Sequence, residues 1–288
     1  MFYSRAALLT LLALIAFAGN SILCRIALAH TNIDAASFTT IRLLSGAVVL
    51  WVLVMLRNRN RHDSMKVRGQ GSWLSALALF VYAAGFSFAY IQLNTGIGAL
   101  ILFGAVQTSM IAFGLWRGER FTTAQWLGLL LACSGLIGLL LPGLSAPPLT
   151  GAMLMITAGI AWGVYSLRGK GAGDPLQVTA GNFSRTVPMA LLLSLLLLNR
   201  ASLDSAGIYY ALLSGALTSG VGYAIWYSAL PLLKATTAAT VQLSVPLLAA
   251  LGGVVLLQEP VTLRLLLAAL AILGGIALVV LKPNRVRG

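Results

Sequence analysis

Aromatic residues recur at a helical spacing inside an apolar stretch. Tyr82, Phe86 and Tyr90 lie at positions i, i+4 and i+8, so a helix would carry the three rings on one face. A shift of 137 positions brings Phe86 onto Tyr223 and Tyr90 onto Tyr227. A flat ring substrate would pack against such a lining, with about 0.5–1.5 kcal/mol per ring pair beyond burial. Anchoring at the membrane surface is the alternative role for Tyr90 and Tyr227, which lie near predicted segment ends.

Neutral polar side chains accompany these rings. Four amides lie deep in apolar stretches: Asn20, Gln107, Asn182 and Gln242. Each can donate and accept hydrogen bonds, so each could hold the amino or the carboxyl group of a zwitterion. The alternative is that they join helices, a contribution of about 0.6 kcal/mol on average. Trp162 and Tyr165 are three residues apart and could share a helical face with the cavity.

Three arginines lie within apolar stretches, namely Arg25, Arg42 and Arg185. Burial of each is unfavourable by at least a few kcal/mol unless the side chain is paired, hydrated or extended to the surface. The six acids fall in predicted loops or at segment ends: Asp34, Asp63, Glu119, Asp174, Asp204 and Glu259. We therefore expect Arg25 to reach outward toward Asp34, and Arg42 and Arg185 to face a hydrated cavity where they attract a carboxylate.

The sequence lacks the patterns of an enzyme. It contains no Gly-rich phosphate loop, no HExxH motif and no Ser/His/Asp set with plausible geometry. His30 and His62 lie in predicted loops, and Cys24 and Cys133 lie singly in apolar stretches. We therefore expect no catalytic residues, no metal and no cofactor.

Composition places the chain in a membrane. Charged residues make up 9% of its 288 residues and hydrophobic residues 59%, whereas soluble domains contain about 25% charged residues. The net charge of +13 would suggest nucleic acid for a soluble protein. Here the basic residues gather in alternate connections, as membrane topology requires, so we expect a lipid bilayer and no nucleic-acid partner.

Ten apolar stretches are long enough to be membrane-spanning helices. They cover residues 5–28, 35–56, 72–91, 96–116, 124–141, 151–167, 176–198, 208–230, 235–257 and 263–281. Lys and Arg accumulate in the connection 57–71 and in every second connection after it. The positive-inside rule then places both termini in the cytoplasm, across a bacterial inner membrane.

The segment 94–141 recurs at 234–281, shifted by 140 positions. The matched pairs include Glu119 with Glu259, Thr122 with Thr262, and Gly135 with Gly275. We expect two five-helix repeats, residues 1–145 and 146–288, which together form one transmembrane domain. Five is odd, so the second repeat enters the membrane from the opposite side. Inverted repeats are typical of secondary transporters with a substrate site near the midplane; a duplicated scaffold without transport is the alternative.

The two hairpins and one helical motif point to a family. Gly118-Glu119, Gln258-Glu259-Pro260 and Ala161-Trp162-Gly163, together with the five-plus-five pattern, resemble the drug/metabolite transporter superfamily, EamA type. Within it the chain is most similar to the bacterial aromatic amino acid exporters of the YddG type. The resemblance implies a basket of helices around a central cavity with alternating access. The match of Trp162-Gly163 is Ala18-Gly19, so the two halves need not line the cavity alike.

The sequence thus predicts an all-α integral membrane protein, with ten transmembrane helices as two inverted repeats around a central cavity. We expect it to export small zwitterionic metabolites, aromatic and other neutral amino acids first, without proton coupling. The predicted substrate-binding residues are Asn20, Tyr82, Phe86, Tyr90, Trp162, Tyr165, Asn182, Tyr223 and Gln242. A carrier of anionic or sugar-linked metabolites is the alternative within transport.

Overall fold

The protein is a bundle of helices, seen in a computed structural model that describes residues 2–59, 70–118, 120–143, 146–169, 172–229, 232–233 and 241–281. The described residues contain helices and no strand. The helices are α1 (Phe2–His30), α2 (Ala35–Arg59), α3 (Trp73–Tyr90), α4 (Thr95–Trp116), α5 (Thr123–Leu140), α6 (Leu149–Gly169), α7 (Pro175–Leu196), η1 (Leu198–Arg200), α8 (Ser205–Leu213), η2 (Ser214–Val221), α9 (Gly222–Ala229), α11 (Ser244–Leu257) and α12 (Leu263–Leu281). Asp63, Glu119, His62 and the predicted start of the ninth span lie outside the described residues.

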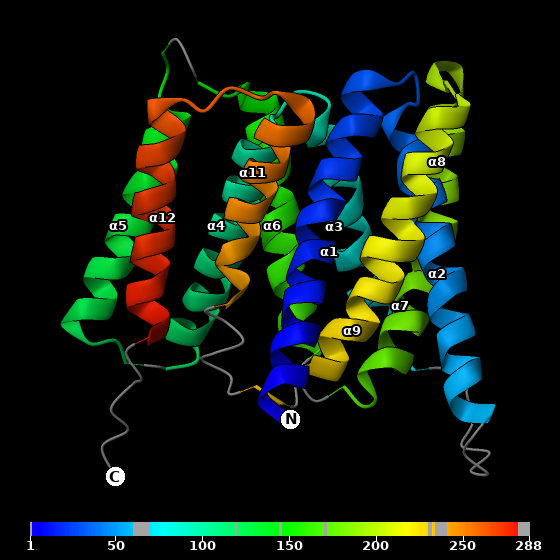
Figure 1. The fold of residues 1–288 in the computed structure, drawn as a ribbon, viewed down its shortest axis with the longest axis horizontal. Coiled ribbons are helices and arrows are strands. Elements are labelled where there is room, and N and C mark those ends of the chain that lie inside the picture. The colour runs from blue at the N-terminus through cyan, green and yellow to red at the C-terminus, as the bar shows by residue number, and fades with distance from the viewer. Residues whose placement is uncertain are drawn as a thin grey trace.

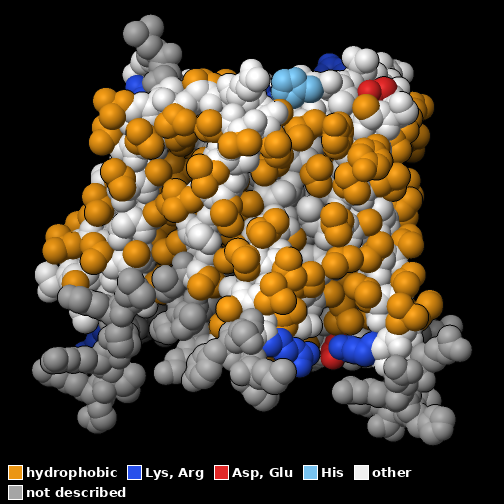
Figure 2. Space-filling model, in the orientation of Figure 1, with side chains coloured by type: hydrophobic (Ala, Val, Ile, Leu, Met, Phe, Trp, Pro, Cys, Tyr) orange, Lys and Arg blue, Asp and Glu red, His pale blue; other side chains and the backbone are white. Residues whose placement is uncertain are grey.

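Eight helical segments of the described chain are long and apolar enough to cross a membrane. One of them is the continuous segment Ser205–Ala229, formed by α8, η2 and α9. Of the remaining predicted spans, α7 carries many polar side chains, and α11 is a shorter apolar helix of 14 residues. Figure 2 shows an apolar belt between two ends where the charged side chains gather. The predicted all-helical membrane class is therefore confirmed.

The helices form a bundle in which consecutive long segments reverse direction, with α8, η2 and α9 counted as one segment (Figure 1). The N-terminal end of α1 and the C-terminal end of α12 lie at the same side of this bundle, which we call the terminal side. We count α8–η2–α9 as one segment and leave out the short η1. Segments five places apart in the chain then pack together: α2 against α7, α4 against α11, and α5 against α12. α3 packs on α6, and the segment α8–η2–α9 packs on α1 in the same way.

Helix N-caps recur at a shift of 140 positions. Asp34 accepts hydrogen bonds from first-turn N–H groups of α2, and Asp174 accepts one from the first turn of α7. Thr122 caps α5, and Thr262 accepts from an N–H group in the first turn of α12. Such side-chain oxygens satisfy N–H groups that have no partner within the helix. In both pairs the two capped helices begin at opposite sides of the bundle (Figure 1).

The α5–α12 pair packs through glycine. A Cβ at Gly275 would overlap backbone atoms of Gly128 and Ala132, and a Cβ at Gly135 would lie within 3.1 Å of Ile272 atoms. Gly135 with Ile272 and Gly275 with Ala132 are related by the same shift of 140 positions. Glycine therefore allows a close approach of the two helix backbones, as small residues do in membrane helix pairs.

Candidate functional site

A cavity of about 580 Å³ lies within the bundle. Its lining comes from α1, α2, α3, α4, α6, α7, η2, α9 and the residues just before α11. It extends from the buried side chains of Asn20 and Arg42 to exposed residues where α6 ends and α7 begins, Gly169, Gly173 and Pro175. The cavity therefore opens toward the terminal side.

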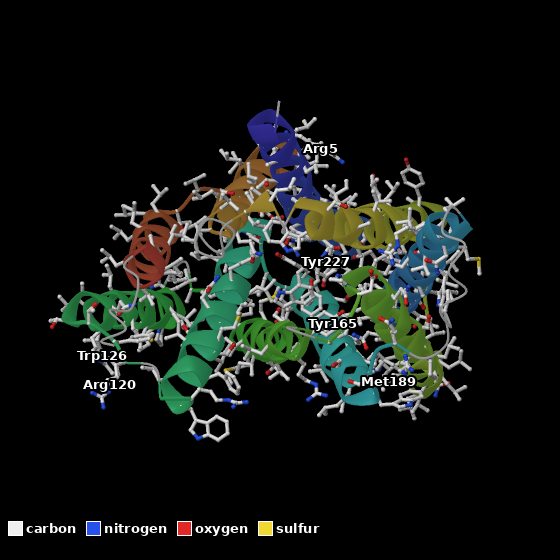
Figure 3. The ribbon with its side chains drawn as sticks, turned by 90° about the horizontal axis from the view of Figure 1, so that it is seen from below. Arg5, Arg120, Trp126, Tyr165, Met189 and Tyr227 are labelled. Carbon is white, nitrogen blue, oxygen red and sulfur yellow. The ribbon has the colours of Figure 1, made fainter. Side chains whose placement is uncertain are left out.

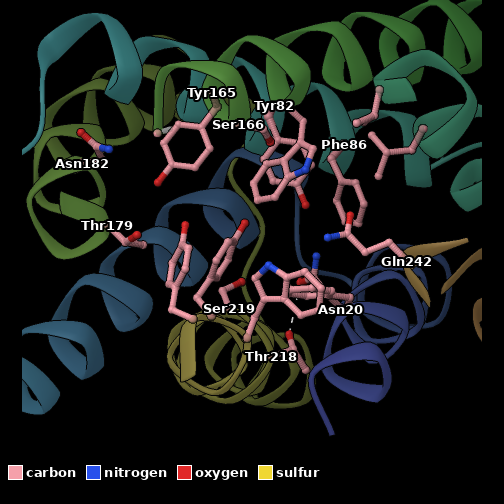
Figure 4. A pocket seen from close by; sticks show the side chains of 18 of the residues that line it. Asn20, Tyr82, Phe86, Tyr165, Ser166, Thr179, Asn182, Thr218, Ser219 and Gln242 are labelled. Carbon is pink, nitrogen blue, oxygen red and sulfur yellow. Dashed lines mark hydrogen bonds between the residues drawn. The ribbon is translucent and has the colours of Figure 1, made fainter. Parts of the chain in front are cut away.

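Eight of the nine side chains predicted to bind substrate line this cavity (Figure 4). They are Asn20, Tyr82, Phe86, Trp162, Tyr165, Asn182, Tyr223 and Gln242. Tyr90 does not line it, because its ring packs edge-on against Phe86 at 4.7 Å and its hydroxyl donates to the Thr95 carbonyl. Viewed from the terminal side, Tyr165 and Tyr227 lie inside the ring of helices, whereas Trp126 and Met189 lie outside it (Figure 3).

The aromatic lining is centred on Trp162. Its ring centroid lies 4.6 Å from that of Tyr82, 5.4 Å from Tyr165 and 5.5 Å from Tyr223. Tyr82 in turn contacts Phe86 at 5.5 Å. Rings from α3, α6 and α9 therefore meet at one place, and the spacing lies in the range of favourable tilted and edge-on pairs.

Arg42 supplies a positive charge to this lining. The residue is 3% exposed, and its Nη2 donates to the Tyr82 hydroxyl at 3.3 Å. The guanidinium carbon lies 4.9 Å from the centroid of the Phe86 ring and 5.6 Å from that of Tyr82. Among the described residues, Nε and Nη1 have no hydrogen-bond partner. A buried guanidinium with unused donors is suited to attract a carboxylate.

Arg185, the second arginine expected to face the cavity, lies elsewhere. Its Nη1 donates to the carbonyl oxygens of Gln70 and Gly181, at 3.0 and 2.9 Å, and the residue is not part of the cavity lining. The guanidinium thus ties α7 to the residues that precede α3. Its charge is held by backbone carbonyls and by other contacts within the bundle.

Polar groups also gather at the mouth of the cavity. The hydroxyl groups of Tyr165 and Thr179 and the amide of Asn182 line this part of the cavity, and the Asn182 oxygen accepts from the Ser72 N–H at 2.9 Å. These side chains carry hydroxyl and amide groups and no charge. In Figure 4 Asn182, Thr179 and Tyr165 lie together, apart from Asn20, Phe86 and Gln242. The cavity therefore has two polar regions that flank the aromatic cluster.

An ion pair stands beside the mouth. Arg57 Nη2 and Asp174 Oδ1 are 2.8 Å apart, and Gly173 and Pro175 on either side of this acid line the cavity. Burial by itself raises the pKa of Asp174, but hydrogen bonds from Arg57 and from the Gln177 N–H outweigh it and lower the pKa below its ordinary value. Asp174 is therefore ionised at neutral pH. Sequence reasoning missed this pair, which joins residues 117 positions apart.

Contacts around Arg25 join helices at the side of the bundle opposite the mouth. Its Nε lies 3.5 Å from Glu259 Oε1, and its Nη1 donates to two carbonyl oxygens at the end of α3. The Glu259 carboxylate also accepts from the Thr95 N–H and hydroxyl. The expectation that Arg25 reaches toward Asp34 is therefore wrong. The carboxylate of Asp34 instead accepts backbone N–H groups, including that of Ser202.

Some lining residues carried no clear sequence signal. Thr218 and Ser219 belong to η2, a π-helical segment inside the predicted eighth span, and Trp226 and Phe17 add apolar surface. The run of small and hydroxyl residues from 214 to 221 could have indicated an irregular turn. Apolar periodicity alone does not distinguish a π-helix from an α-helix.

Comparison with known proteins agrees with this fold. A solved crystal structure superposes with a TM-score of 0.66 at 18% identity, over 96% of this chain and 97% of the other. An uncharacterized protein of Pseudomonas aeruginosa is 59% identical over 275 residues, which is 96% of this chain and 94% of that protein. The threonine/homoserine exporter RhtA of Escherichia coli is 32% identical over 191 residues, or 62% of this chain and 63% of RhtA.

The sequence model of the EamA-like transporter family matches this chain twice, over residues 4–141 and 149–281. These two matches cover nearly all of the chain, and the helical fold with its apolar belt suits a protein that crosses the bilayer several times. The chain is a multi-pass membrane protein that belongs to the EamA-like transporter family.

Proposed function

We propose that this protein exports neutral amino acids, aromatic ones first, across the bacterial inner membrane. The observation that carries the proposal is Arg42, a buried guanidinium that faces the cavity with two donors unused and lies against the Phe86 ring. A relative, RhtA, is named a threonine/homoserine exporter. That name supports an amino acid substrate, and the aromatic lining supports a ring in its side chain.

The proposed binding mode uses Arg42, the aromatic cluster and two amides of the cavity lining. The substrate carboxylate accepts from the guanidinium of Arg42. Its side chain packs among the rings around Trp162. The α-ammonium group lies toward the amides of Gln107 and Gln242, which line the same cavity and offer carbonyl oxygens as acceptors.

The proposed mechanism is alternating access between two inverted five-helix repeats, residues 1–145 and 146–288, with ten spans and both termini cytoplasmic. Support comes from the two family matches, from the packing of helices five places apart and from N-caps that recur at a shift of 140 positions. In this orientation the cavity opens to the cytoplasm and is closed toward the outside by Arg25 and Glu259. An exporter would load its substrate in this state.

A monocarboxylate without an ammonium group is the second candidate substrate. Among the described lining residues Arg42 carries the charge, and there is no Asp or Glu. An anion would neutralise the cavity, whereas a zwitterion would leave one positive charge. This charge balance favours the anionic substrate. The aromatic lining and the named relative favour the amino acid instead.

An export assay distinguishes the two candidates. Cells that express the protein are loaded with phenylalanine, threonine or 3-phenylpropionate, which is phenylalanine without its amino group, and the medium is sampled over time. We expect phenylalanine to leave faster than in cells with an empty vector, and threonine to follow more slowly. Export of 3-phenylpropionate alone would identify the monocarboxylate carrier. Export of none of the three would contradict both candidates.

A further inference from the structure

We infer that Asn20 is a second recognition residue for the substrate carboxylate, held as an N–H donor by the π-helical segment η2. The inference deepens the proposed function and rests on it. It assigns one of two roles that the sequence left open for this amide, which by residue type could bind either the carboxyl or the amino group of a substrate.

The orientation of Asn20 follows from its hydrogen bonds. The Ser214 hydroxyl lies 2.7 Å from Oδ1 of Asn20, and the Thr218 hydroxyl lies 3.3 Å from the same atom. The Thr218 hydroxyl has one hydrogen, which it donates to the Ser214 carbonyl oxygen at 2.8 Å. The Ser214 hydroxyl is therefore the donor that orients the amide oxygen of Asn20. Asn20 lines the cavity, and among the described residues its Nδ2 makes no hydrogen bond. The group that Asn20 offers to a substrate is therefore its NH2 group, a donor.

The same segment also holds the backbone of Arg42. A Cβ at Gly215 would overlap the Arg42 carbonyl oxygen and the Ser45 hydroxyl, so η2 and α2 are in close contact at this point. η2 packs against α1, which carries Asn20, and against α2, which carries Arg42. One π-helical turn thus contacts the side chain of Asn20 and the backbone of Arg42. π-helical turns are rare and often occur at functional sites.

The chemistry of this region follows from its donors. Arg42 offers N–H donors and a positive charge, and Asn20 offers Nδ2, whereas the Asn20 oxygen already accepts from Ser214. A carboxylate brings acceptors only, and an ammonium group brings donors only. The region around Asn20 and Arg42 therefore selects the carboxylate and rejects the amino group. Ser214 acts through Asn20 and is a positioning residue.

Replacement of Asn20 by Asp separates this role from a structural one. Asn20→Asp keeps the shape and the oxygen that accepts from Ser214, but it removes the NH2 group and places a negative charge in the cavity that Arg42 also lines. We expect KM for phenylalanine efflux from proteoliposomes to rise at least tenfold. Asn20→Ala should raise KM by a smaller factor, because it removes the donor without adding the charge. Asn199→Asp in the exposed η1 makes the same charge change away from the cavity and should leave KM unchanged.

Ser214→Ala tests the positioning. It frees the amide to rotate, so we expect KM to rise severalfold while kcat and the yield of folded protein stay near wild type. The inference is overturned if Asn20→Asp transports with the wild-type KM, because a purely structural Asn20 would tolerate Asp. It is also overturned if Ser214→Ala lowers kcat alone. Failure of the wild-type protein to move any carboxylate would instead contradict the proposed function, before the variants are compared.

Discussion

Arg25 on α1 and Glu259 in the turn before α12 form an ion pair, with 3.5 Å between Nε and Oε1, at the end of the bundle opposite the cavity mouth. The side chains are 17% and 11% exposed. The pair joins residues 234 positions apart, and through Thr95 it also holds the start of α4. It therefore links both halves of the chain at this end of the bundle, and we expect it to hold this end closed.

Removal of the charge on Glu259 should loosen this end. In a Cys133→Ser background Cys24 is the one remaining thiol of the chain, and it is fully buried on α1, one residue from Arg25. We expect Glu259→Gln to raise the rate at which an impermeant maleimide labels Cys24 from the side opposite the termini. Arg25→Gln should do the same, and the double variant should add little, because both changes break one interaction.

Asp34→Asn provides the control for that labelling experiment. Asp34 lies on the same side of the bundle, and its carboxylate accepts backbone N–H groups rather than an arginine. This variant should leave the labelling rate of Cys24 unchanged. Unchanged labelling in Glu259→Gln and Arg25→Gln would contradict the closing role of the ion pair.

The contact between α5 and α12 predicts that alanine substitutions at two adjacent glycines, Gly274 and Gly275, will affect stability very differently. Gly275→Ala would force a Cβ into the backbone of Gly128 and Ala132, whereas a Cβ at Gly274 meets nothing within 4 Å. We expect Gly275→Ala to destabilise the protein by about 1–3 kcal/mol, as overpacking does. Gly274→Ala should be neutral or slightly stabilising. Thermal unfolding in detergent measures both, and equal melting temperatures would contradict the packing.

The sequence predicted much of the cavity and little of its closure. Tyr82, Phe86 and Trp162 could be identified because helical spacing places side chains on one face regardless of tertiary contacts. Tyr90 shares that spacing, yet it lies where the end of α3 meets the start of α4, so its ring is enclosed. The pairing of Arg25 with Glu259 depends on how distant helices pack, which no local pattern records.

The aromatic cluster predicts a preference for phenylalanine over threonine that depends on Trp162. Trp162→Ala removes ring contacts worth about 0.5–1.5 kcal/mol each. We expect KM for phenylalanine to rise roughly tenfold on this basis, while KM for threonine changes less. Trp126→Ala is the matched control, because Trp126 is 47% exposed and lies outside the ring of helices (Figure 3). An equal rise in KM for both substrates would contradict a role of Trp162 in ring recognition.

Transport should not require a proton gradient. Proton-coupled carriers use a group that titrates near neutral pH, usually a carboxylate with a raised pKa or a histidine. The described cavity lining contains neither Asp, Glu nor His. We expect phenylalanine to move down its own gradient in proteoliposomes at equal pH on both sides. Uptake that begins only when a pH gradient is imposed would contradict this uniport mechanism.

Whether Arg42 binds the carboxylate of a transported substrate is tested most directly by phenylalanine efflux from proteoliposomes that contain wild type or Arg42→Gln. Gln keeps a polar side chain but loses the charge and the guanidinium donors. Hydrogen bonds to charged groups contribute about 1.5–3 kcal/mol each, so kcat/KM should fall by roughly 10- to 100-fold. The exposed Arg120→Gln should match wild type. Wild-type efflux in Arg42→Gln would contradict the proposed site.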